Sequence, residues 1–502
     1  MKAEADLFFL QGVNQLVGHG WPYSPKEAGE PGWAFYAAAA LNDHNPWWLV
    51  MPEVTRYLQR ISYVLRQGKP ANDVVLLLPT DDAWAQFTVG KDSVSESIER
   101  LLGPDVIPQI LDAGFNFDLI DSAAIAKTGI PYPVLILQGV ERLPLATYRQ
   151  IETYARNGGI VIATRSLPSQ APGLLETQTD TPQEREISED LFHASTGSGV
   201  YVSDEKELGK TLTQHVKPDF KTFPHASEIG FVHRKLPFAD IYFLANTSNR
   251  PISTTATFRA SEPYAEWWDP SSGDISPAST NSTVELSLQP YESRIIVFAS
   301  DNPSTAARPK TKMFVPGPSR GVLDLGIDWI ITFSDIERTV HMNRLHSWTD
   351  DEETHFYSGK AIYEKKFTVS GKILNPRIRA YLDFGPGTVV ERPQAGHPRM
   401  RAWLEGPVRE AARVFVNDQD VGSIWKPPYE LEISGLLHPG ENHLRIVVGN
   451  LAINTLAGHS LPDYKLLNSR YGERFVPQDM ENLQPLPAGL LGPVRLIIEE
   501  SP

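Results

Sequence analysis

Cysteine is absent from the 502-residue sequence. Disulfide bonds, thiolate metal sites and cysteine nucleophiles are therefore excluded. The sequence also lacks any run of about 20 apolar residues, so we expect no membrane-spanning helix. The apolar stretch near the start covers only Leu7 to Leu10 and follows Glu4 and Asp6. We expect no signal peptide within this chain, because such a peptide needs a longer apolar core after a basic start.

Blocks rich in lysine or arginine are absent as well. The 46 basic and 61 acidic residues give a formal net charge of -15. An acidic surface repels phosphate backbones, so we expect no nucleic-acid partner. The apolar share of 41% and the charged share of 21% are ordinary for a globular protein, and the length predicts three or four domains.

The first region, residues 1–70, predicts a short buried strand over 13–19 and then a loop rich in aromatic residues, proline and glycine. In the next stretch apolar residues recur every three or four positions, which predicts a helix over 51–67. These positions are Val54, Leu58, Ile61 and Leu65. Gly68 and Pro70 favour an end to this helix.

The second region, residues 71–225, alternates predicted strands and helices. The continuous apolar run VVLLLP at 74–79 is typical of a strand buried on both faces, and further strands are predicted over 134–139 and 160–164. A helix over 107–113 is predicted to lead to a further strand over 117–121, and another helix, over 144–157, is predicted before the strand at 160–164. This order predicts an α/β domain with a parallel sheet.

The remaining regions are rich in predicted strands. Residues 226–300 predict a small β domain, residues 301–319 a proline-rich linker, and residues 320–502 an antiparallel β-sandwich. In the small domain Val284, Leu286 and Leu288 alternate with polar residues, as in a half-buried strand. The predicted fold class is therefore multidomain, α/β followed by all-β.

The last region resembles the galactose-binding-like jelly roll of family 2 glycoside hydrolases. The similarity lies in LHSWTD (345–350), FYSGKAIYEKKF (356–367) and the stretch from VFVNDQDVG to HLRIVVGN (414–450). Asn417 and Asp418 in this stretch favour a hairpin turn.

The second region resembles a glutamine-amidotransferase-like domain. An amidotransferase needs a nucleophilic cysteine, so the resemblance implies that this domain is a scaffold.

The first region resembles glycoside hydrolase family 106, of the α-L-rhamnosidase type. The similar segments are QGVNQLVGHGWPYSP (11–25), PGWAFYAAAALNDHNPWW (31–48) and RYLQRISYVLRQGKPANDVVLLLP (56–79). In such proteins these segments form the last strand and helix of a (β/α)8 barrel. A barrel needs about 250 residues, so we expect most of its strands to lie upstream of this chain.

This resemblance implies an inverting hydrolase acting on rhamnose-containing plant glycosides or pectic polysaccharide. Its acid and base carboxylates are expected upstream, so this chain alone should have little or no activity. A calcium ion is implied in the sugar subsite of the complete enzyme, but we assign no cofactor or metal ligand to this chain. The complete enzyme is expected to be secreted or periplasmic, and the sequence does not define its oligomeric state.

Seven residues of the first region are our candidates for substrate binding: His19, Trp21, Tyr23, Asn42, His44, Trp47 and Trp48. Sugar C–H faces stack on aromatic rings, and polar side chains bind hydroxyl groups. His19 follows the predicted strand, at the end where barrel enzymes place ligand-binding groups. The alternatives are that the rings pack in a core and that residues 42–45 cap the next helix.

Three other sets of residues contain side chains that occur in binding sites. Asp81, Asp82 and Trp84 follow a predicted strand, and we interpret them as a solvated turn. Trp267 to Pro270 resembles a structural turn. Four aromatic residues of the sandwich are weaker sugar-binding candidates: Trp348, Tyr357, Trp425 and Tyr429.

Two alternative functions remain at this stage. The chain could be a non-catalytic carbohydrate-binding or scaffold protein, or a glycosidase of the family 2 or family 42 type. Binding without hydrolysis would favour the first alternative, and a panel of aryl glycosides would test the second.

Overall fold

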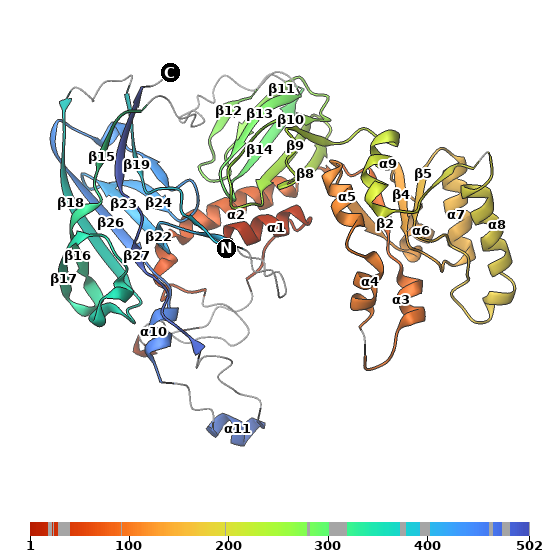
Figure 1. Cartoon of the computed structure of the whole chain (residues 1–502), viewed down its shortest axis with the longest axis horizontal. Coiled ribbons are helices and arrows are strands. Elements are labelled where there is room, and N and C mark those ends of the chain that lie inside the picture. Colours follow the sequence, from red (N-terminus) through yellow and green to blue (C-terminus); the bar gives the residue numbers. More distant parts are fainter. Residues whose placement is uncertain are drawn as a thin grey trace.

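The computed structural model of the chain describes residues 1–18, 23, 25–28, 41–91, 93–195, 197–278, 282–300, 319–371, 378–391, 402–460, 465–473 and 482–500. Figure 1 shows an α/β domain, a central β-sandwich and a C-terminal β-sandwich, with the central one between the other two. Helices α1 (Lys2–Leu10) and α2 (Met51–Leu65) run below the central sandwich in this view. Among the described helices none is long and apolar enough to cross a membrane.

The α/β domain is built on a parallel sheet with the strand order β3-β2-β4-β5-β6. Its strands are β2 (Val74–Leu77), β3 (Phe117–Ile120), β4 (Val134–Gln138), β5 (Ile160–Thr164) and β6 (Gly199–Val202). Its helices are α3 (Thr80–Gln86), α4 (Val94–Leu102), α5 (Val106–Asp112), α6 (Ser122–Thr128), α7 (Leu145–Arg156), α8 (Thr181–Phe192) and α9 (Leu208–His215). The predicted parallel sheet is confirmed.

Both faces of this sheet are covered. Alternate residues of β2 and β4 pack against α6, α7 and α8 on one face and against α5 and α9 on the other. Every residue of β2 and β4 is buried as a result. This explains why their sequences are apolar with no polar alternation, apart from Gln138 at the end of β4, whose amide donates to the carbonyl oxygen of Leu101.

The central sandwich pairs a six-stranded sheet, in the order β1-β8-β9-β14-β11-β12, with a three-stranded sheet, in the order β13-β10-β7. The larger sheet contains β1 (Lys69–Pro70), β8 (Ile229–Leu236), β9 (Ala239–Asn246), β11 (Tyr264–Trp268), β12 (Ile275–Pro277) and β14 (Ser293–Ala299). The smaller contains β7 (Phe220–Phe223), β10 (Ile252–Phe258) and β13 (Thr283–Leu288). Burial alternates along β13, as its sequence predicts.

Helices α1 and α2 cover the outer face of the six-stranded sheet. Phe9 of α1 and Tyr57 and Ile61 of α2 share one core with Ile241 and Phe243 of β9. Each fully buried large apolar side chain of such a core contributes about 1.5–3 kcal/mol. Strand β9 is buried along its whole length because the sandwich core covers its other face.

A buried polar network also joins α1 to this sheet. Lys2 Nζ donates to Asp6 and to the carbonyl oxygen of Tyr291, each over 2.6 Å. The Tyr57 hydroxyl donates to Asp6 and lies 2.6 Å from Ser293 Oγ. Burial, and then the neighbouring Asp6, raises the pKa of Tyr57, so this hydroxyl stays a donor.

The C-terminal sandwich has a four-stranded sheet in the order β15-β28-β19-β25 and a six-stranded sheet in the order β17-β16-β18-β26-β23-β24, both antiparallel. The four-stranded sheet contains β15 (Ser319–Asp324), β19 (Ile378–Asp383), β25 (Glu430–Glu432) and β28 (Arg495–Glu500). The six-stranded sheet contains β16 (Ile327–Phe333), β17 (Arg338–Arg344), β18 (Lys360–Val369), β23 (Ala411–Val416), β24 (Gln419–Ile424) and β26 (Gly440–Gly449). Short elements complete it: β20 (Thr388–Val389), β21 (Leu404–Glu405), β22 (Val408–Arg409), β27 (Gly489–Leu490), α10 (Ile453–Gly458) and α11 (Lys465–Tyr471).

One hydrophobic core lies between these two sheets and contains Trp329, Trp348 and Tyr363, all fully buried. The predicted antiparallel sheets are confirmed, and the assignment as a jelly roll stays a prediction.

Asn417 and Asp418 both have positive φ values, 50° and 62°, at the turn between β23 and β24. The predicted hairpin turn is confirmed there, since a tight turn of this kind needs left-handed residues.

Helix α2 also contacts the C-terminal sandwich. Val50 and Val54 share a small core with Ala411 of β23, and Trp425 packs against it. Trp425 also meets the Tyr57 ring edge-on, with a centroid distance of 6.1 Å. Helix α2 is therefore held between the two sandwiches. It holds in place the segment that precedes it.

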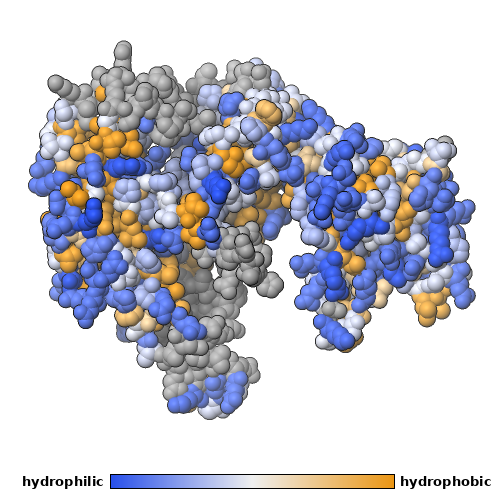
Figure 2. All heavy atoms as spheres, in the orientation of Figure 1, coloured by the Kyte–Doolittle hydropathy of each residue, from blue (hydrophilic) through white to orange (hydrophobic). Residues whose placement is uncertain are grey.

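Figure 2 shows a mainly hydrophilic face on the α/β domain and hydrophobic side chains gathered on the C-terminal sandwich. Three of the exposed apolar residues of that sandwich are Val322 of β15 and Ile327 and Ile330 of β16, which are 50–58% exposed. They lie towards the outer strands, where single exposed apolar residues are common in folded proteins.

Two predictions for the first region need correction. The strand predicted over 13–19 is wrong for residues 13–18, which form no strand, and Val17 is 83% exposed. A strand is stable only when neighbours satisfy its backbone groups, and no described strand pairs with this segment. The sequence reading also missed α1.

The predicted linker at 301–319 lies outside the described residues up to 318, and Ser319 already belongs to β15.

Candidate functional site

The segment just before α2 carries four of the predicted substrate-binding residues. Asn42 is 1% exposed, and its Oδ1 accepts a hydrogen bond from the backbone N–H of His44 over 3.2 Å. The chain then enters a short 3-10 helix, η2 (Pro46–Val50). Asn45 holds the N-cap position of η2, but its side chain makes no capping bond. Asn42 thus has a local role in shaping the turn.

This segment lies directly against the C-terminal sandwich. A Cβ on Gly449 of β26 would collide with the carbonyl oxygen of Pro46, so glycine allows η2 to approach the strand. Trp47 packs against the small core of Val50, Val54 and Ala411, and its ring lies 6.0 Å from that of Trp48. Both indoles are half-buried, which leaves part of each ring accessible.

The structure therefore brings Asn42, His44, Trp47 and Trp48 together in one anchored turn. Tyr23 is 75% exposed. His19 and Trp21 lie outside the described residues. The role of all seven in sugar binding stays a prediction.

The interpretation of Asp81 and Asp82 as a solvated turn is wrong. Both lie in the first turn of α3, and Asp82 is only 1% exposed. Its Oδ2 accepts the backbone N–H groups of Glu141 and Arg142, and its Oδ1 pairs with the Arg142 guanidinium over 3.0 Å. A carboxylate is stable in this position because each oxygen has a donor.

Trp267, Asp269 and Pro270 make structural contacts, as interpreted, whereas Trp268 is half-buried and also borders a cleft described below. Trp267 is 6% exposed in the core of the central sandwich. Asp269 Oδ1 accepts the backbone N–H of Ser271 over 2.7 Å. Arg60 of α2 donates to the carbonyl oxygen of Pro270 over 3.0 Å, which ties this turn to the helix.

The sugar-binding candidates in the C-terminal sandwich divide into two groups. Trp348 is fully buried and donates its Nε1–H to Tyr363 over 2.6 Å, and the Tyr357 hydroxyl donates to Asp335 over 2.8 Å. A sugar-binding role for these two is wrong, because their rings are enclosed in the core. Trp425 is half-buried and Tyr429 is 8% exposed, and both border a cleft.

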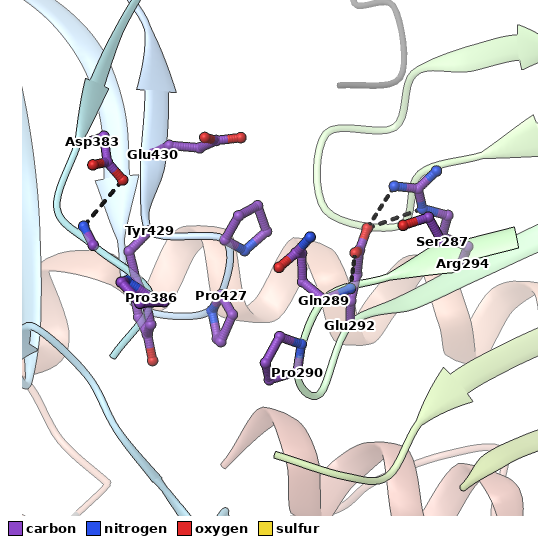
Figure 3. Close-up of a pocket in the computed structure, with 12 residues that line it drawn as sticks. Ser287, Gln289, Pro290, Glu292, Arg294, Asp383, Pro386, Pro427, Tyr429 and Glu430 are labelled. Atoms are coloured by element: carbon purple, nitrogen blue, oxygen red, sulfur yellow. Dashed lines mark hydrogen bonds and ion pairs between the residues drawn. The ribbon is translucent and has the colours of Figure 1, made fainter. Parts of the chain in front are cut away.

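This cleft lies between the central and C-terminal sandwiches, and the sequence reading did not find it. It consists of two hollows of about 240 and 510 Å³ that share Glu292, Arg294, Pro428 and Glu430. Figure 3 shows the smaller hollow, with Glu430 extending from the C-terminal side towards Glu292 and Arg294 on the opposite side. We call the two hollows together the inter-sandwich cleft.

Three carboxyl groups of the inter-sandwich cleft differ in their partners. Glu292 Oε1 accepts two hydrogen bonds from Arg294, over 2.9 and 2.8 Å. Asp383 Oδ2 accepts from Arg495 over 2.8 Å. No hydrogen bond or ion pair joins the Glu430 carboxyl to another described residue. Burial raises the pKa of Glu430 to about 7, and neighbouring carboxylates add to this.

No local signal marks this cleft in the sequence. Glu430 stands in an alternating strand and Glu292 in a turn, as many surface carboxylates do. Within the described ranges no group of three or more His, Asp or Glu side chains could hold a metal ion. We therefore assign no calcium site to these residues.

Comparison with known proteins gives one family match and two informative relatives. The family model for alpha-L-rhamnosidase, glycoside hydrolase family 106, matches residues 1–282. A solved rhamnosidase from Novosphingobium sp. PP1Y is similar in fold, with a TM-score of 0.72 and 23% identity over 99% of this chain and 46% of that one. A Formosa agariphila protein named "Putative beta-glucuronidase" is 25% identical over 338 residues, which cover 63% of this chain and 27% of that protein.

The chain thus spans less than half the length of each of these two proteins. The family model covers more than half of this chain, including the turn before α2, the helix itself and the whole α/β domain. The mixed α/β and β architecture described above agrees with the fold of the solved rhamnosidase. This chain belongs to glycoside hydrolase family 106, the α-L-rhamnosidase family.

Proposed function

We propose that the chain is part of a glycoside hydrolase that cleaves α-L-rhamnosides of plant glycosides or pectic polysaccharide with inversion. The observation that carries this proposal is the family match over residues 1–282. That range contains all seven substrate-binding candidates, from His19 to Trp48. We propose that they contact the sugar, with the aromatic rings stacking on its C–H faces and the polar groups binding hydroxyls.

The contacts of α2 support this proposal, because the helix would anchor the turn that carries four of the candidates. One side of α2 packs on the outer face of β9, and the other contacts β23 through Val54. The turn at residues 42–48 is held against β26 at Gly449. Sugar-binding groups must keep their positions to within a fraction of an ångström, and a helix fixed on two sides supports the turn that precedes it.

Inversion requires a carboxylic acid and a carboxylate base roughly 6.5–9.5 Å apart on opposite faces of the sugar. We propose that both belong to barrel strands of a longer enzyme. The 502-residue chain on its own is therefore expected to hydrolyse an aryl α-L-rhamnoside very slowly or not at all.

The test compares this chain with a longer protein that contains it and the barrel. Both are assayed with aryl α-L-rhamnoside, aryl β-D-glucuronide and aryl β-D-galactoside. We expect the longer protein to turn over the rhamnoside alone. Robust turnover by the 502-residue chain would overturn the placement of the carboxylates, and preference for another glycoside would overturn the substrate.

A further inference from the structure

We propose that the inter-sandwich cleft binds a neutral oligosaccharide, with Glu430 as the main group that accepts hydrogen bonds from its hydroxyls. The sugar class of this ligand rests on the proposed function above. The location, the charge preference and the role of Glu430 rest on the geometry of the cleft.

The cleft has the size and the side chains that sugar binding needs. Its larger hollow, of about 510 Å³, lies within the usual range of about 300–1,000 Å³ for small-molecule sites. Trp268 and Trp425 border it from opposite sandwiches, and both indoles are half-buried. An indole in this state offers an apolar face to a pyranose ring while its position stays fixed by packing.

Glu430 differs from the neighbouring carboxyl groups, because both of those already accept hydrogen bonds from other residues. Glu292 uses Oε1 for Arg294, and its Oε2 accepts the backbone N–H of Gln289 over 2.7 Å. Asp383 uses Oδ2 for Arg495 and Oδ1 for the backbone N–H of Gly385. The Glu430 carboxyl makes no bond to a described residue, although it lines the smaller hollow together with both of these groups and also borders the larger hollow.

A sugar hydroxyl matches this arrangement, because it can donate to one group and accept from another. Glu430 supplies acceptor oxygens. Lys426 supplies donors, since its Nζ makes one long bond of 3.5 Å to the carbonyl oxygen of Pro427 and borders the same hollow. Lys426 is half-buried, and burial lowers the pKa of its amine.

The charges of the cleft favour a neutral ligand over an acidic one. Six carboxyl-bearing and three cationic side chains line the larger hollow. A uronic acid would bring another carboxylate next to Glu430, whose pKa is already raised by burial and by Asp383. Like charges at close range are repulsive, so neutral sugar residues such as rhamnose fit better.

The experiment is isothermal titration calorimetry on the 502-residue chain with a neutral rhamnose trisaccharide and with a galacturonic acid trisaccharide. We expect the wild-type chain to bind the neutral sugar more tightly. At pH 8, above the pKa of about 7 of this carboxyl, Glu430→Gln should weaken this binding about tenfold or more, because a charge-assisted acceptor is lost. Glu441→Gln is the matched control, since Glu441 is an exposed carboxyl of the same sandwich outside the cleft.

Three results would overturn the proposal: no heat of binding with the wild-type chain, equal affinity in the Glu430→Gln variant, or tighter binding of the acidic trisaccharide. Near-ultraviolet circular dichroism of each variant checks that the sandwiches stay folded. Binding is measured without hydrolysis. Binding that Glu430→Gln weakens therefore supports this proposal whatever the rhamnosidase assay gives, and an active longer enzyme whose binding Glu430→Gln leaves unchanged overturns this proposal alone.

Discussion

Glu184 of α8 tests how the burial of a carboxyl group changes the stability of the α/β domain with pH. Its side chain is 0% exposed, and neither carboxyl oxygen has a hydrogen-bond partner among the described residues. Burial, and then the nearby Asp180, raises the pKa of this carboxyl from 4.5 to about 7. The substitution Glu184→Gln keeps the size of the side chain and removes its titration.

The expected effect follows from the two pKa values. Between about pH 4.5 and pH 7 the unfolded chain has lost a proton that the folded chain still holds, so the wild-type protein loses stability as the pH rises. Above pH 7 the carboxyl is ionised in both the folded and the unfolded chain, and the full loss of stability has developed. A shift of one pKa unit corresponds to about 1.4 kcal/mol, so the total cost is about 3 kcal/mol, of which about 2.5 kcal/mol develops between pH 5 and pH 8.

Urea unfolding of wild type and Glu184→Gln at pH 5 and pH 8 measures this effect. We expect the free energy of unfolding of the variant, relative to wild type, to rise by about 2.5 kcal/mol between the two pH values. A glutamine amide that finds no partner adds a penalty that is equal at both pH values, so the change with pH is the informative quantity. Glu186→Gln, an exposed change on the same helix, should show no such rise. If the relative stability of Glu184→Gln is the same at pH 5 and pH 8, the reasoning is refuted.

Two further substitutions test buried hydrogen bonds. Asp82→Asn should destabilise the α/β domain by about 3 kcal/mol in thermal unfolding, because Arg142 loses the charge that it pairs with; an unchanged melting temperature would contradict a structural role for Asp82. Tyr57→Phe should cost about 1–3 kcal/mol and speed amide hydrogen exchange in α1, because Asp6 loses a buried donor. Tyr63→Phe on the exposed side of the same helix is its control, and equal effects of the two would contradict the reasoning.

The spacing of apolar residues predicted the secondary structure correctly wherever a segment followed a single helical or strand periodicity. The apolar run of β2 predicted a strand buried on both faces, and the spacing of Val54, Leu58 and Ile61 predicted α2 nearly to its ends. The alternation along β13 predicted a half-buried strand. In each case the side chains themselves carry the information, because burial on one face or two leaves a different apolar period in the sequence.

The same method failed where a segment depends on distant neighbours. VNQLVGH reads as a strand, yet residues 14–18 are exposed and residues 13–18 pair with no described strand. Helix α1 was missed, although Phe9 is fully buried against β9. The hydrophobic pattern of nine residues is too short to distinguish a helix that packs on a sheet from a strand.

The sequence by itself determined the family, the parallel sheet of the α/β domain, the antiparallel strands that follow and the hairpin turn at Asn417. Only the tertiary structure decided that α2 lies between two sandwiches, that Trp348 is enclosed in a core, and that Glu292 and Glu430 face one cleft. The physical reason is chain connectivity. Strand and turn preferences act between near neighbours, whereas the cleft brings together side chains more than a hundred residues apart, and its charges perturb one another only after both sandwiches have formed.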